Sequence, residues 1–174
     1  GMTVQTLDGD GADYNACPGF ATGAIGNVVV SPSFFITDSA RLVGTVVTGA
    51  VLKFTTSAGG QLSYSANTAD NGKITLNYPS GFFDTAATPV PTVAITGPSG
   101  VTATCGAPGA TSLVISLSSG SSAIPASTAV TITFTNLKLG ASATAGNPTG
   151  MTVQTLDGDG ADYNACPGFA TGAI

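Results

Sequence analysis

The sequence predicts an all-β fold, an antiparallel β-sandwich, and three observations point to it. Charged residues make up only 7% of the 174 residues, and Glu, His and Trp are absent, which leaves little from which helices are built. Val, Ile, Thr and Phe dominate the stretches that look ordered, and these residues suit half-buried strands. Glycine (24 residues) and proline (10 residues) interrupt those stretches at short intervals, as turns do. A closed barrel of the same strands is the alternative.

The strands follow from short apolar or alternating runs between turn signals. The cleanest alternation is Ala129–Thr135, where Val130, Ile132 and Phe134 share one face and threonines the other. Pro32 either limits the strand before it or marks an edge strand. In chain order, the expected strands are 2–7, 27–30, 42–47, 51–56, 61–66, 73–78, 90–96, 101–105, 112–118, 129–135 and 151–156.

Two local motifs add detail to this pattern. Asp70-Asn71-Gly72 separates the strands at 61–66 and 73–78, and Asn-Gly predicts a tight hairpin between them because both residues tolerate positive φ. Phe82-Phe83 follows a Pro-Ser-Gly turn, and we expect this pair to plug one end of the core.

A duplicated segment indicates how the chain is organised. Residues 1–25 and residues 150–174 have the same sequence, so the period is 149 residues. One period is an ordinary domain size. We therefore expect a tandem array with one sandwich per repeat, in which the strand at 151–156 closes the sandwich. Accordingly, 1–24 would be the C-terminal strand and connector of a preceding repeat, 25–168 the β-sandwich module, and 169–174 the start of the connector to the next.

Three runs carry a family resemblance: ITLNYPSGFF (74–83), IPASTAVTITFTNLKLG (124–140) and NPTGMTVQTLDGDG (147–160). Together they are similar to immunoglobulin-like repeats of long extracellular proteins, such as cell-surface filaments, surface layers and adhesins of microbes and algae. The resemblance covers most of one period. It implies an immunoglobulin-like sandwich and a fibre-building role, and it implies no chemistry.

The charge balance limits which binding partners and which cellular location we expect for the protein. The four basic residues (Arg41, Lys53, Lys73 and Lys138) form no basic run, so nucleic acid is not an expected partner. No apolar run reaches the ~18–20 residues of a membrane span. A surface covered by Ser, Thr, Asn and Gly suits an extracellular, wall-like setting, and its low charge opposes lateral association of copies only weakly.

The cysteines predict one disulfide per repeat. One period holds Cys105 and Cys17, which recurs as Cys166, and an even count in an extracellular protein favours pairing. The expected domain boundary favours Cys105–Cys166, with Cys17 pairing with an adjacent repeat. Pairing of Cys17 with Cys105 would instead join two modules, and two free buried thiols are the remaining alternative.

The duplicated segment also carries an acidic, glycine-rich loop. Closely spaced oxygen ligands in such a loop are able to hold Ca²⁺, the one cofactor the sequence suggests. Its Asp-Gly-Asp-Gly run is equally expected to make two tight turns capped by the aspartates. The candidate ligands are Asp8, Asp10, Asp13 and Asn15, repeated as Asp157, Asp159, Asp162 and Asn164.

Two function classes remain after these exclusions. The first is a structural repeat of an extracellular filament, stalk or cell-surface coat, whose partners are neighbouring repeats and lateral copies. The alternative is an adhesin module in which residues such as Tyr14, Tyr64 and Tyr78 stack on glycan. An enzyme is not expected, because the absence of His and Glu removes the commonest general bases.

Overall fold

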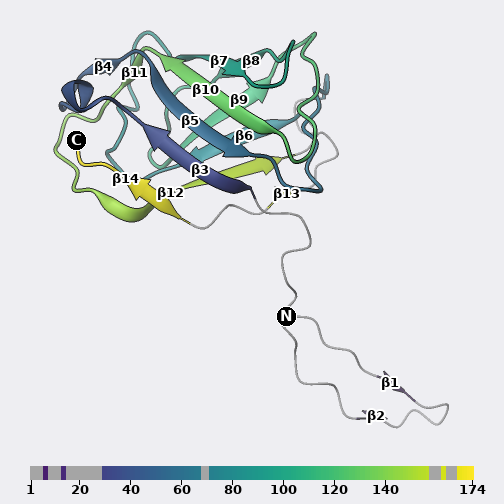
Figure 1. Ribbon diagram of the computed structural model, residues 1–174. Helices are drawn as coiled ribbons and strands as arrows, with labels where there is room; N and C mark the ends of the chain where they lie inside the picture. The colour runs from purple at the N-terminus through teal and green to yellow at the C-terminus, as the bar shows by residue number, and fades with distance from the viewer. Residues whose placement is uncertain (1–5, 8–12, 15–28, 68–70, 157–161, 164–167) are drawn as a thin grey trace.

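The computed structural model of the chain describes residues 6–7, 13–14, 29–67, 71–156, 162–163 and 168–174. The prediction of an all-β fold is confirmed: the described residues form antiparallel sheets and a single 3-10 turn, η1 (Asp38–Ala40). Residues 29–67, 71–156 and 168–174 make up what we call the folded body (Figure 1).

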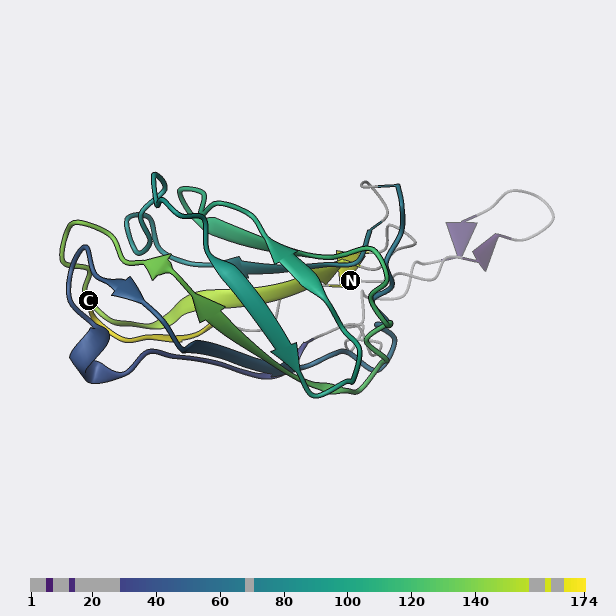
Figure 2. The same ribbon diagram turned by 90° about the horizontal axis from the view of Figure 1, so that it is seen from above.

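Two larger sheets form the two layers of the folded body (Figures 1 and 2). The four-stranded sheet has the order β3 (Val30–Phe35), β5 (Ala50–Thr55), β10 (Ala129–Thr135) and β7 (Thr92–Thr96). The six-stranded sheet has the order β13 (Asp162–Tyr163), β12 (Asn147–Leu156), β6 (Lys73–Asn77), β9 (Ser112–Leu117) and β8 (Ala103–Cys105), and β14 (Phe169–Thr171) also pairs with β12. Two short ladders join β4 (Val46–Val47) to β11 (Leu137–Lys138) and β1 (Thr6–Leu7) to β2 (Asp13–Tyr14).

One apolar core lies between the two sheets, an arrangement compatible with a β-sandwich. The alternating residues of β9 and β10 supply much of it, as their period of two predicts: Leu113, Ile115, Ile132 and Phe134 are at most 1% exposed. The aromatic plug is also confirmed. Phe82 and Phe83 are buried and meet edge to face, with ring centroids 4.9 Å apart.

β3 shows how Pro32 fits into a strand. The strand continues through the proline, and its pairing with β5 shifts register between Val30 and Ser33. β3 lies at an edge of its sheet, where a residue without an N–H breaks no ladder on the open side. The expectation of an edge strand is therefore confirmed, although the strand runs later than 27–30.

The hairpin predicted between 61–66 and 73–78 is wrong. β6 pairs with β9 and β12, and from the 61–66 stretch only Leu62 makes an isolated bridge, to Ile124. The reason is that β9 and β12 occupy both edges of β6, so the two stretches meet only beside the turn, where the N–H of Gly72 donates to the Ser63 carbonyl at 2.8 Å and the side chain of Asn71 is buried. Its Oδ1 accepts a hydrogen bond from the N–H of Ser65 at 3.0 Å, and its Nδ2 donates to the Leu117 carbonyl at 2.7 Å.

The expected closing strand is present but longer, and the chain folds beyond it. β12 includes Asn147 and pairs with β6 over Thr152–Leu156. The segment 169–174, expected to begin a connector, instead contains β14 and packs on the body, so Ile174 belongs to the core. The glycine and alanine residues of this segment give no hydrophobic periodicity, so the sequence pattern did not predict this strand.

The folded body has two ends. At one, the proximal end, β3 begins: Val30 pairs with Thr55, and the N–H of Thr56 donates to the Thr128 carbonyl at 3.0 Å. At the other, the distal end, Ile174 and Thr144 exchange two backbone hydrogen bonds of 3.1 Å. Figure 2 shows the C-terminus beside η1 at this extremity.

Candidate functional site at the distal end

The distal end is closed by the last seven residues of the chain. The N–H of Asn147 donates to Oγ1 of Thr171 at 2.9 Å, and the 3.1 Å bonds between Ile174 and Thr144 fix the terminus. β14 also lies beside β3, so this segment joins one edge of each sheet. Thr171 and Ile174 are buried, whereas Phe169 packs half-buried against the core.

Glycines determine the fit of this closing segment. A Cβ on Gly168 would overlap the backbone carbonyl of Thr149, and a Cβ on Gly172 would overlap the guanidinium group of Arg41. Arg41 is itself held in place, because its Nε donates to the Ile36 carbonyl at 3.0 Å and lies 3.5 Å from Oδ1 of Asp38. The slot therefore accepts this sequence of small residues and excludes bulkier ones.

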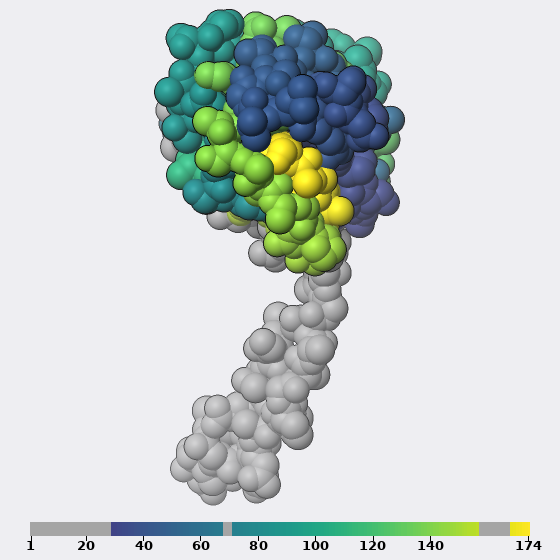
Figure 3. All heavy atoms as spheres, turned by 90° about the vertical axis from the view of Figure 1, so that its left-hand side faces the viewer, coloured from purple at the N-terminus to yellow at the C-terminus, as the bar shows by residue number. Residues whose placement is uncertain are grey.

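Exposed apolar side chains gather next to the closing segment. Leu42, Val43 and Val46 are 62%, 47% and 50% exposed. The N–H of Gly44 donates to the Gly140 carbonyl at 2.8 Å, which ties this stretch to the distal end. Figure 3 views this end and shows the dark-blue stretch beside the yellow C-terminal residues. We call Leu42, Val43 and Val46 the distal apolar patch; such a patch is typical of a contact surface.

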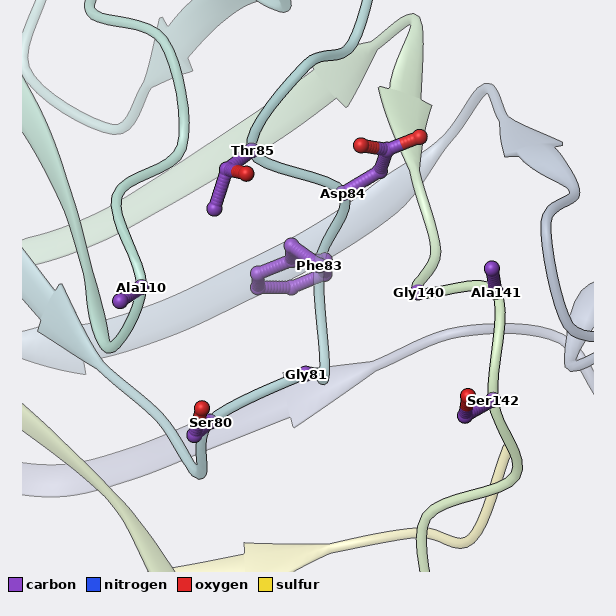
Figure 4. Close-up of a pocket in the computed structure, with 9 residues that line it drawn as sticks. All are labelled: Ser80, Gly81, Phe83, Asp84, Thr85, Ala110, Gly140, Ala141 and Ser142. Atoms are coloured by element: carbon purple, nitrogen blue, oxygen red, sulfur yellow. The ribbon is translucent and has the colours of Figure 1, made fainter.

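A hollow of about 330 Å³ lies at the same end. Figure 4 shows the hydroxyl groups of Ser80, Thr85 and Ser142 around it, with the ring of Phe83 between them. Gly140 forms part of its wall and leaves no space for a Cβ, which would overlap the Gly81 carbonyl. The lining thus combines a larger apolar share, from groups such as Phe83 and Ala141, with hydroxyl groups that are able to hydrogen-bond a polar loop.

Asp84 is the one carboxylate in the lining of this hollow. Lys138 Nζ donates to Asp84 Oδ2 at 2.7 Å, and the N–H of Ala86 donates to Oδ1 at 2.9 Å. The hydrogen bond from Lys138 lowers the pKa of Asp84 below its ordinary value. The Asp84 carboxylate is therefore ionised at neutral pH and is held by Lys138 and the backbone of Ala86.

Cys105, half-buried on β8, forms no disulfide within the described part of the chain. Burial raises the pKa of its thiol to about 12. β8 is the edge strand of the large sheet; β13 and β14, which flank Cys166 in sequence, pair with β12 beyond β6 and β9. Cys17 and Cys166 lie outside the described residues, so the predicted pairings stay predictions.

The calcium candidates lie mostly outside the described residues as well. Asp8, Asp10, Asn15, Asp157, Asp159 and Asn164 are not described, and of Asp13 and Asp162 only the strand backbone is. The two copies of this region form matching ladders, since Thr6 pairs with Tyr14 as Thr155 pairs with Tyr163. No cluster of metal-ligating side chains occurs among the residues that the structure does describe.

The aromatic residues considered for glycan stacking separate into two groups. Tyr64 is 38% exposed, whereas Tyr78 is buried and its Oη lies 2.9 Å from the carbonyls of Gly109 and Ser112. Burial raises the pKa of Tyr78, with a smaller contribution from Cys105. The side chain of Tyr14 is not described.

The sequence did not identify the distal apolar patch or the hollow. The run Leu42–Val47 was expected to be one strand, and only Val46–Val47 pair as β4. The signal that could have found the patch is Gly44, which interrupts the run and has a φ of 69°. Over the described residues, no helix is long and apolar enough to cross a membrane.

Comparisons with known proteins add no relative to this description. No protein-family model, no curated protein and no solved structure matches the chain.

Proposed function

We propose that the chain is a structural repeat of a long extracellular filament, stalk or cell-surface coat, in which folded bodies follow one another end to end. The observation that carries the proposal is the path of the chain. The body begins with Val29 and Val30 at the proximal end and finishes with Ile174 at the distal end. Successive copies of such a body extend along one axis.

The duplicated sequence sets the spacing between these copies. Ile174 corresponds to Ile25, and Val29 is 1% exposed, so only residues 26–28 separate the core of one copy from that of the next. Four peptide steps span at most ~14 Å. Neighbouring bodies must therefore touch, with the distal end of one facing the proximal end of the next.

The distal end has the chemistry of a contact face. The distal apolar patch would be removed from water by the next body, at a gain of up to ~1.5–3 kcal/mol per large aliphatic side chain. The hollow beside it offers hydroxyl groups for hydrogen bonds to a loop of the next body. A disulfide in each repeat and Ca²⁺ in the acidic loop would stiffen the joint further.

A chain of two full periods tests the contact. Its first body should melt at a higher temperature than the single-period chain, because array stability is the sum of module and interface terms. Leu42→Ser with Val43→Ser in the first body should remove this gain. The same two substitutions in the second body, whose distal end faces solvent, are the matched control and should leave the gain in melting temperature intact.

The proposal also predicts where the natural protein is found. Antibodies against the folded body should label intact source cells or the material they shed, and the labelled objects should be regular fibres or a coat. Two results speak against a structural repeat: labelling that requires permeabilised cells, and two bodies that melt as the single one does.

A further inference from the structure

The slot that closes the folded body is filled by a sequence that the chain contains twice. Residues 150–156 form most of β12, and residues 168–174 form the closing segment. Residues 1–7 and 19–25 have the same side chains in the same order. Apart from residues 147–149 at the start of β12, the side chains that these two elements place in the slot are therefore present a second time, at the other end of the same chain.

The side chains that enter the slot are those the core requires. Met151 and Val153 are fully buried between the sheets, and Gly168 has no room for a Cβ. Their counterparts are Met2, Val4 and Gly19. A strand that brings these residues meets the same apolar and steric demands as β12 and β14.

The two copies also share local backbone pairing. Thr6–Leu7 pairs with Asp13–Tyr14 in one copy, and Thr155–Leu156 pairs with Asp162–Tyr163 in the other, in the same register. The first copy therefore carries part of the required conformation in its own sequence.

The first copy fits its own slot poorly because of the chain path. In that slot, Ile25 would lie at the distal end beside Thr144, whereas Val30 begins β3 at the proximal end. The five steps of β3 from Val30 to Phe35 span ~17 Å, and the five steps from Ile25 to Val30 reach at most ~18 Å, so this link would have to be stretched almost fully along the body. A second chain is free of this limit.

We propose that residues 1–25 are a donor segment that completes the folded body of a second copy of this chain. The donated segment replaces residues 150–156 of β12 and the whole of β14 in the recipient, so chains with an open slot join head to tail without a covalent link. The proposal concerns chains in which residues 1–25 do not already close a preceding body, and it does not rest on the function proposed above.

Variants of this 174-residue chain test the exchange, and the duplication provides matched controls. Val153→Asp places a charge at a fully buried position and should expel the chain's own closing strands. Size-exclusion chromatography with light scattering should then show folded species at multiples of 16.9 kDa. Val4→Asp alone should leave a monomer with the melting temperature of the unchanged chain. The double variant, Val4→Asp with Val153→Asp, should form no folded oligomers and should not fold as a monomer.

Other results overturn the proposal. A Val153→Asp chain that stays a folded monomer shows that no second chain is needed. If the variant is an unfolded monomer, a peptide of residues 150–174 is added. Refolding by the peptide shows that the slot is open but that the first copy cannot fill it, and no refolding shows that the slot accepts no segment from outside.

Discussion

Gly168 lies against the backbone carbonyl of Thr149 so closely that a methyl group cannot fit between them. Gly168→Ala should therefore push β14 away from β12 and lower the free energy of unfolding by ~1–3 kcal/mol, the usual cost of overpacking. Urea unfolding followed by circular dichroism measures the change.

The duplicated sequence supplies the control for this substitution. Gly19→Ala makes the same chemical change outside the folded body and should leave its unfolding free energy unchanged. Gly172→Ala should cost less than Gly168→Ala, because the atoms it meets are the end of the Arg41 side chain, which is able to move. Equal midpoints for Gly168→Ala and Gly19→Ala would show that the segment does not close the body.

The Asp84–Lys138 pair should make stability depend on pH in the acid range. The pKa of Asp84 is lowered in the folded state from its ordinary 3.8, so its stabilisation is present above that value and is lost as the pH falls through the lowered pKa. Asp84→Asn should lower the melting temperature at pH 7 and lower it less at pH 2. The control is Asp38→Asn, at a fully exposed carboxylate 3.5 Å from Arg41, and it should change the melting temperature less. A difference of the same size at both pH values would rule out the ion pair as its cause.

The thiol of Cys105 should react slowly in the native chain. Burial raises its pKa to about 12, so little thiolate is present at pH 8. In a Cys17→Ser, Cys166→Ser chain, iodoacetamide should label Cys105 at least ~100-fold more slowly in buffer than in urea. Because the folded pKa is raised, the associated stability is full below the ordinary thiol pKa and falls as the pH rises toward 12. Native labelling at the urea rate would contradict the burial. Non-reducing mass spectrometry of the unchanged chain reports whether Cys105 is paired.

Calcium should raise the melting temperature if the acidic loops bind it. The relevant comparison is the unchanged chain with 2 mM, an amount on the order of the weakest extracellular sites, against the same chain with chelator. Asp157→Asn with Asp159→Asn should abolish the shift that comes from the loop after β12, whereas Asp8→Asn with Asp10→Asn reports on the first copy alone. Identical melting curves with calcium and chelator would leave the tight-turn interpretation.

The sequence predicted the strands in which buried and exposed residues alternate. It missed the segments whose positions depend on contacts with residues far away in the chain. β9 and β10 were predicted to within a residue or two, because their apolar residues recur with a period of two and face one core. The hairpin with the stretch 61–66 failed because β9 and β12 occupy both edges of β6, and the side chain of Asn71 bonds to Ser65 and Leu117 beside the turn. Local turn chemistry does not reveal a hydrogen bond to Leu117, which lies 46 residues away.

The candidate site could be predicted only in part, for a similar reason. The duplication drew attention to residues 150–174, and Phe82 and Phe83 were expected at an end of the core. The closing segment was missed because its fit depends on the absence of side chains at Gly168 and Gly172, which is visible only once Thr149 and Arg41 are placed beside them. The distal apolar patch was missed because its residues resemble a buried strand in sequence.

The central claim is that consecutive bodies meet distal end to proximal end across three residues. Small-angle X-ray scattering from a chain of two full periods tests it most directly. β12 alone spans ten residues, or ~33 Å, so the maximum dimension should grow by at least that length over the single-period chain, with the narrow distance distribution of one rigid rod. A maximum dimension that hardly grows would contradict the end-to-end arrangement, and a broad distribution from two independently moving bodies would contradict the contact between them.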